Sequence, residues 1–303
     1  MENLWALALP LGAALAYVAA ALSLKRAADL GVGLWHSTVV CNVLAALVFQ
    51  SLLLLGGTWA PLPHAWWQPL VIALLFIAGQ MATLFALQKG DVSLATPVLG
   101  LKILLVALFT TLVVRQGVPG KLWLPAAVLR PAGIVVLNRA GGGGARRAAD
   151  SSPSPVARTV ASAGLAAAAY ALFDVLVQKW SPAWGMGRLL PLTVALVGVL
   201  SCTLIPLFPT PLRSLSPSAR RWLVLGGLLM GFQSLLFVSA IAHFGQATVA
   251  NIVYSSRGLW SVLAVALLGH WFRNAEQAHG GAVLRGRFVG ALLMFAAIAL
   301  LLV

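Results

Sequence analysis

Residues 4–24 read LWALALPLGAALAYVAAALSL, an apolar run that contains no charged side chain. A helix of about 20 apolar residues is long enough to cross the hydrocarbon core of a bilayer. The run is longer than the apolar region of a signal peptide, and only Met1, Glu2 and Asn3 precede it. We therefore predict that this segment is a retained transmembrane helix.

Similar runs recur along the whole chain, which has 303 residues, of which 61% are hydrophobic and 9% are charged. A soluble domain has about 25% charged residues, so this composition excludes one. It predicts an all-α, multi-pass integral membrane protein with ten transmembrane helices, and we expect the plasma membrane as its location. The expected helices cover residues 4–24, 32–56, 66–88, 92–114, 121–138, 158–179, 187–208, 221–242, 247–269 and 285–303.

The net charge of +14 does not indicate a nucleic-acid partner, because the basic residues lie mostly between the apolar runs. Cationic loops of this kind set the topology of a membrane protein. They are concentrated in the connections that follow the odd-numbered helices. The positive-inside rule therefore predicts that these connections are cytoplasmic and that both termini lie outside.

Residues 139–155 read RAGGGGARRAADSSPSP, a run of glycine, serine, proline and charge. Such a composition buries too little apolar surface to order itself. We predict a flexible basic linker at residues 139–157. It separates a first five-helix repeat at residues 1–138 from a second at residues 158–303.

The two halves resemble each other when one is shifted by 153 to 155 positions. Residues 13–17 (AALAY) then fall on residues 166–170 (AAAAY), and Gln80 falls on Gln233. With the larger shift, Lys102 falls on Arg257. Because five helices per half is an odd number, the second half is expected to be inverted. Inverted repeats are typical of secondary transporters, whose substrate site lies between the repeats near the membrane midplane.

Two segments carry a resemblance to a known family. Residues 86–100 (ALQKGDVSLATPVLG) and 290–298 (GALLMFAAI) resemble the entry to the fourth helix and the closing helix of EamA-type members of the drug/metabolite transporter superfamily. The resemblance implies ten helices, transport of a small metabolite, and termini on the cytoplasmic side. Arg115 and His270 stand where that family commonly has an acidic residue, so the role of that acid is not carried over.

Lys102 and Arg257 lie near the middle of expected helices 92–114 and 247–269. A charge at that depth costs about 2.5–3.5 kcal/mol on insertion scales, so each of these cations is expected to have a functional or structural role that offsets the cost. We predict that both bind an anionic or zwitterionic substrate, since arginine offers a planar fork to phosphate or carboxylate and lysine a point charge. Replacing either is expected to abolish transport while leaving insertion intact. The alternative is that a protein acid neutralises them.

Asp174 is the one acid placed deeply enough to serve as that partner, as a counter-charge or as a coupling group. It follows Tyr170 by four residues, which places both on one face of a helix and makes Tyr170 a substrate-binding candidate. The alternative is a carboxylate near the helix end that pairs with Lys179. Without an internal counter-charge, an empty site with two cations is expected to favour exchange over net transport. Arg130 is a candidate third cation, or a structural one.

Tyr254 and Ser261 lie three residues before and four residues after Arg257, and this spacing places them on its helix face. Both are therefore predicted to bind substrate. Gln80 and Gln233 are further candidates. A membrane glutamine also commonly hydrogen-bonds to a neighbouring helix, and that alternative stays open.

Other classes of function have less support in the sequence. The five histidines lack the spacing of metal ligands, and neither a cofactor motif nor a nucleophile motif is present, so a membrane-embedded enzyme is the weaker alternative. An exporter of neutral or amphipathic metabolites, such as amino acids or sugars, is the alternative within transport. The Gly227/Gly231 and Gly286/Gly290 spacings permit close helix contact, and a homodimer is one use of such a face.

Overall fold

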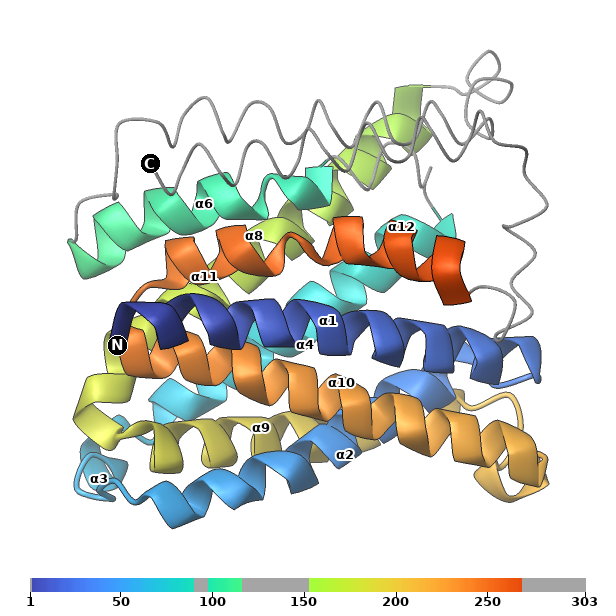
Figure 1. Cartoon of the computed structure of the whole chain (residues 1–303), viewed down its shortest axis with the longest axis horizontal. Coiled ribbons are helices and arrows are strands. Elements are labelled where there is room, and N and C mark those ends of the chain that lie inside the picture. Colours follow the sequence, from blue (N-terminus) through green and yellow to red (C-terminus); the bar gives the residue numbers. More distant parts are fainter. Residues whose placement is uncertain (1, 90–97, 116–152, 269–303) are drawn as a thin grey trace. The chain divides into compact units, whose positions relative to one another are not determined.

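The computed structural model describes residues 2–89, 98–115 and 153–268, and every regular element in them is a helix (Figure 1). The long helices are α1 (Glu2–Asp29), α2 (Leu34–Phe49), α4 (Trp67–Lys89), α8 (Pro153–Trp184), α9 (Met186–Cys202) and α10 (Pro217–Phe244). The shorter ones are α3 (Leu62–Ala65), α6 (Lys102–Phe109), α11 (Ala247–Tyr254) and α12 (Arg257–Leu268). Three 3₁₀ turns, η1 (Gln50–Leu55), η3 (Ile205–Leu207) and η4 (Leu212–Ser214), and a π-helical turn, η2 (Thr110–Val114), complete the set.

Five helical segments are long and apolar enough to cross a membrane, which agrees with the prediction of an all-helical membrane protein. They are Leu4–Asp29, Leu34–Leu55, Trp67–Ala86, Arg158–Trp184 and Pro217–Phe244. Val98–Val114 and Met186–Cys202 are shorter apolar segments. The expected helices at 121–138 and 285–303 lie outside the described residues, as does most of the expected linker. Its last residues, from Pro153 on, already belong to α8, because proline suits the first turn of a helix.

Two expected helices differ from the prediction at the positions of the deep cations. A turn at Leu101 precedes α6, which begins at Lys102. Ser255 and Ser256 form a turn between α11 and α12, and α12 begins at Arg257. The expected helix at 247–269 is therefore interrupted next to Arg257, whereas the turn at Leu101 lies within the apolar helical segment Val98–Val114. Residues 254–257 (YSSR) are polar, but hydropathy averaged over the length of a helix does not locate a break within it.

The chain folds into two compact units, each of which combines segments of both predicted halves. Unit 1 holds residues 1–77 and 176–250, and unit 2 holds residues 78–175 and 251–303. In unit 1, α1 packs on α10, α10 on α2, and α2 on α9 (Figure 1). Glycines allow these close approaches, as expected for helices that pack in a membrane. A Cβ on Gly231 would lie 2.9 Å from the Cα of Ala45, so the Gly227/Gly231 spacing on α10 allows close contact with α2.

Gly187, in the first turn of α9, makes the tightest of the approaches in unit 1. A Cβ there would collide with the carbonyl oxygen of Gly56 and lie 2.5 Å from that of Leu52. Both obstacles are backbone atoms, which cannot rotate away as a side chain can.

We expect Gly187→Ala to lower the free energy of unfolding by about 1–3 kcal/mol through overpacking. The measurement is thermal unfolding of the purified protein in detergent. Gly164→Ala is the matched control, because a Cβ on Gly164 meets nothing within 4 Å and alanine favours a helix. Equal melting temperatures for the two variants would contradict the prediction.

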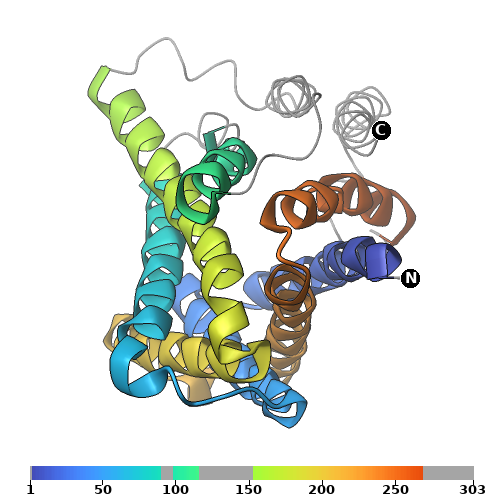
Figure 2. The same cartoon turned by 90° about the vertical axis from the view of Figure 1, so that its left-hand side faces the viewer.

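Unit 2 carries the deep charges. Within it α4 and α8 lie side by side (Figure 2), and Gly79 of α4 faces the ring of Tyr170, whose Cδ1 would be 3.1 Å from an added Cβ. Ala86 and Ala163 continue the same contact. Ile103 and Ile252 pack together and join α6 to α11. These contacts bring α6, α8 and α11 close enough for their polar side chains to meet.

Candidate functional site

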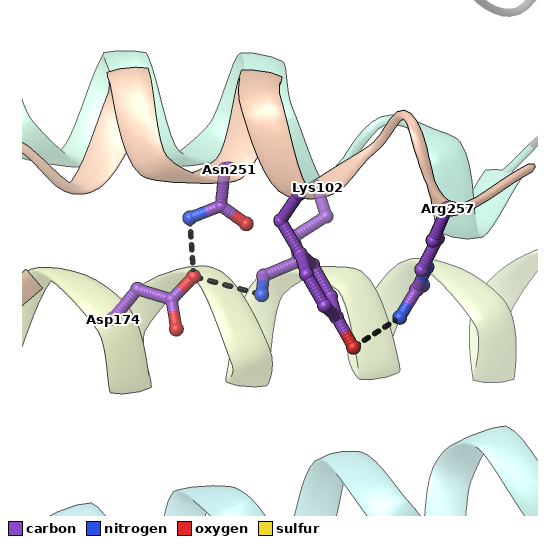
Figure 3. A network of polar contacts seen from close by, with 5 residues as sticks. Lys102, Asp174, Asn251 and Arg257 are labelled. Carbon is purple, nitrogen blue, oxygen red and sulfur yellow. Dashed lines mark hydrogen bonds and ion pairs between the residues drawn. The ribbon is translucent and has the colours of Figure 1, made fainter. Parts of the chain in front are cut away.

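A single carboxylate oxygen in unit 2 joins three helices. Oδ2 of Asp174, on α8, lies 2.7 Å from Nζ of Lys102 on α6 and accepts a hydrogen bond of 2.6 Å from Nδ2 of Asn251 on α11 (Figure 3). Lys102 is therefore paired with a protein acid. This pairing is the alternative that the sequence left open, with Asp174 as the partner acid.

Burial differs sharply between the two members of the ion pair. The side chain of Asp174 is 1% exposed, whereas that of Lys102 is 23% exposed. The second carboxylate oxygen of Asp174, Oδ1, is buried and has no hydrogen-bond partner among the described residues. A carboxylate buried this deeply needs partners that compensate it, and Lys102 and Asn251 are the two partners that contact its Oδ2 atom.

Tyr170 lies one helical turn before Asp174 and contacts the same cation. Nζ of Lys102 is 5.7 Å from the centre of the Tyr170 ring, within the range of a cation–π interaction. The prediction that Tyr170 and Asp174 share one face of α8 is confirmed by their common contact with Lys102.

Arg257 and Tyr254 form a second contact at the break between α11 and α12. Nη1 of Arg257 donates a hydrogen bond of 2.9 Å to the hydroxyl of Tyr254, and its guanidinium carbon lies 4.6 Å from the centre of that ring. The two residues between them, Ser255 and Ser256, are buried, and Ser256 Oγ accepts a hydrogen bond from the indole of Trp260. The contact of Tyr254 with Arg257 agrees with their predicted spacing, although a turn separates them.

Of the remaining predicted residues, Gln233, Gln80 and Ser261 lie on α10, α4 and α12. Gln233 belongs to unit 1, where its Nε2 donates to Ser234 Oγ at 2.7 Å and lies 3.3 Å from the sulfur of Met230. Gln80 is half-buried on α4, and Ser261 is half-buried on α12, one turn after the break. Arg130 lies outside the described residues.

Asn251 and Gln178 are buried polar residues whose roles the sequence does not reveal. Asn251 is close to Arg257 in the chain, but it binds Asp174 instead. In unit 1, Gln178 Oε1 accepts a hydrogen bond of 3.0 Å from the backbone N–H of Ala247, which begins α11. The one available signal was the spacing of Tyr170, Asp174 and Gln178, which repeats every four residues along α8 and marks a polar stripe.

Comparisons with known proteins define the fold only. No family model matches the chain, and no curated protein matches it. The structure is similar to solved structures, with 28 matching chains. One is a crystal structure described only as that of a protein, with a TM-score of 0.72 and 17% sequence identity over 97% of this chain and 95% of that chain. At that identity the likeness shows a shared fold alone.

Proposed function

We propose that this chain is a secondary transporter of a small anionic or zwitterionic metabolite, one that bears phosphate or carboxylate. In this proposal it works by alternating access in the plasma membrane, as an EamA-type member of the drug/metabolite transporter superfamily with ten helices in two inverted repeats. The observation that carries the proposal is the cluster of ionisable groups among the apolar helices of unit 2, where Lys102 is paired with the buried Asp174 and Arg257 contacts Tyr254.

The helix breaks support a transport role. Lys102 and Arg257 fall on one another in the sequence repeat, and each begins a helix directly after a turn. Transporters built from inverted repeats commonly bind substrate at discontinuous helices, whose amino-terminal ends carry a positive dipole and attract anionic groups. Lys102 and Arg257 lie at the amino-terminal ends of α6 and α12, where the helix dipole is also positive. The dipole therefore strengthens the preference for an anion.

The charges at these helices indicate the class of substrate. Lys102 and Arg257 each contribute +1 and Asp174 contributes −1, so the three groups sum to +1. A positive sum favours a ligand with an anionic group over a cation. Arginine also offers two parallel donors that match the two oxygens of a carboxylate or phosphate.

One observation favours a second candidate, an exporter of neutral or amphipathic metabolites such as amino acids or sugars. Lys102 already has a counter-ion in Asp174, so an uncharged ligand beside Tyr170 would not have to compensate it. A membrane-embedded enzyme remains the candidate from another class, and it predicts that a bound compound is chemically changed.

Ligand-induced thermal stabilisation of the purified protein separates these candidates. The compounds are inorganic phosphate, 3-phosphoglycerate, citrate, glutamate and glucose. A ligand at about 100 times its Kd stabilises the folded state by about 2.7 kcal/mol. We expect a raised melting temperature with at least one anion, none with glucose, and recovery of the compound unchanged.

The matched variants for this experiment are Arg257→Gln and Arg213→Gln. Arg213 is exposed on the turn η4 in unit 1, far from the charged cluster in the chain. The anion should no longer stabilise Arg257→Gln but should still stabilise Arg213→Gln. Stabilisation by glucose alone would replace the proposal with its neutral alternative, and a chemically altered compound would replace it with an enzyme.

A further inference from the structure

The ion pair between Lys102 and Asp174 places its cation within reach of a ligand and its acid out of reach. The side chain of Lys102 is 23% exposed, and that of Asp174 is 1% exposed. An anion that approaches this ion pair therefore meets the side chain of Lys102 before it meets the carboxylate of Asp174. In Figure 3, dashed lines join the same oxygen of Asp174 to Asn251 and to Lys102.

Asp174 is also fixed in position, whereas Lys102 has a flexible stem. Asn251, itself only 4% exposed, donates a hydrogen bond of 2.6 Å to the same carboxylate oxygen that contacts Lys102. This bond holds the acid on α8 without using the ammonium. Lysine carries four methylene groups and three donors, so its head can shift toward a ligand while the carboxylate stays in place.

We propose that Asp174 is the resident counter-ion of the substrate site: it neutralises Lys102 whenever the site is empty and shares that cation with the substrate anion when one binds. This inference rests on the proposed transport function. It identifies Asp174 as a positioning residue that determines the mode of transport.

The consequence concerns the return of the empty carrier. Alternating access requires the site to reorient across the membrane, and an uncompensated charge in a low-dielectric environment opposes that step. With Asp174 in place Lys102 adds no net charge to the empty site, so the empty carrier returns faster and net transport is possible. Without Asp174 only a bound anion compensates Lys102, and the carrier becomes an exchanger.

The test compares net uptake with exchange in proteoliposomes. Labelled 3-phosphoglycerate, citrate and glutamate are each offered to empty vesicles and to vesicles that are loaded with the same unlabelled compound. The ratio of the two uptake rates is the trans-stimulation. For the transported compound we expect a ratio near one in the wild type and a ratio raised at least about tenfold in Asp174→Asn, because the empty return alone is slowed.

Asp29→Asn is the charge-matched control, because Asp29 is exposed at the end of α1 and should leave the ratio unchanged. Asn251→Asp provides a test with the opposite sign. At alkaline pH, where the two neighbouring carboxylates no longer share a proton, a second acid beside Lys102 should raise the apparent KM for the anion several-fold and should not raise trans-stimulation. This variant decides the matter if Asp174→Asn does not reach the membrane.

The outcomes separate the inference from its premise. Wild-type uptake that is absent in both modes, with all three compounds, overturns the proposed transport function and the inference with it. Wild-type uptake with an unchanged ratio in Asp174→Asn overturns the inference alone. A raised ratio in Asn251→Asp, or an unchanged KM in that variant, also overturns it.

Discussion

Lys102→Gln is expected to lower the free energy of unfolding by about 3–5 kcal/mol, because it leaves the carboxylate of Asp174 buried without its cation. Asp174 is 1% exposed and cannot turn to water for compensation. From the sequence alone we expected that removing Lys102 would leave insertion intact. The ion pair reverses that expectation, since removal of Lys102 leaves Asp174 as a buried charge without its counter-ion, and this destabilises the fold.

The double variant Lys102→Gln/Asp174→Asn tests this explanation. It removes both charges at once and should recover most of the lost stability, because no uncompensated group stays buried. Thermal unfolding in detergent and the amount of protein in the membrane are the measurements. Lys179→Gln is the matched control, because Lys179 lies exposed on α8. If Lys102→Gln is as stable as the wild type, the ion pair does not stabilise the fold.

Arg257→Lys is expected to reduce transport of the preferred anion by roughly 10- to 150-fold, the equivalent of losing one charged hydrogen bond of about 1.5–3 kcal/mol. The positive charge remains, but lysine lacks the planar fork that binds two oxygens at once. Initial uptake rates in proteoliposomes measure the effect as kcat/KM.

Tyr254→Phe separates the role of the Arg257 cation from that of the hydrogen bond between Arg257 and Tyr254. It removes the hydroxyl that accepts a 2.9 Å hydrogen bond from Arg257 but leaves the ring beneath the guanidinium. Loss of one ordinary hydrogen bond costs about 0.5–1.5 kcal/mol, so its effect on uptake should be smaller than that of Arg257→Lys. Arg213→Lys, at an exposed turn, should transport normally. Normal uptake by Arg257→Lys would remove Arg257 from the site.

The glycine contacts of α10 show that a sequence pattern can predict a close helix contact without predicting the partner helix. The spacing of Gly227 and Gly231 indicated a face for close helix contact, and the structure has such a contact, with α2 of the same unit. A glycine indicates that another helix can approach its backbone closely, but it does not indicate which helix does so. A homodimer through Gly286 and Gly290 stays a prediction, since both lie outside the described residues.

The sequence by itself determined that this chain is all-helical and apolar enough to cross a membrane, as the run at residues 4–24 within α1 illustrates. Insertion depends on the hydrophobicity of each segment taken alone, so it can be predicted from the segment. The spacing of Tyr254 and Arg257, and of Tyr170 and Asp174, was likewise local information. Residues four apart, such as Tyr170 and Asp174, meet along one helix face, and Tyr254 and Arg257 are close enough in the chain to meet across a turn.

Only the tertiary structure decided that Lys102 pairs with Asp174, and that Asn251 binds Asp174 although it lies near Arg257 in sequence. These contacts join α6, α8 and α11, and no periodicity within one segment specifies which faces of separate helices meet. The turns before Lys102 and Arg257 were equally hidden, because hydropathy averaged over a whole segment does not locate a point at which the local backbone bonding changes. The burial of Asp174 depends on packing by segments that are distant in the chain, and the choice of Lys102 as its partner depends on the same packing.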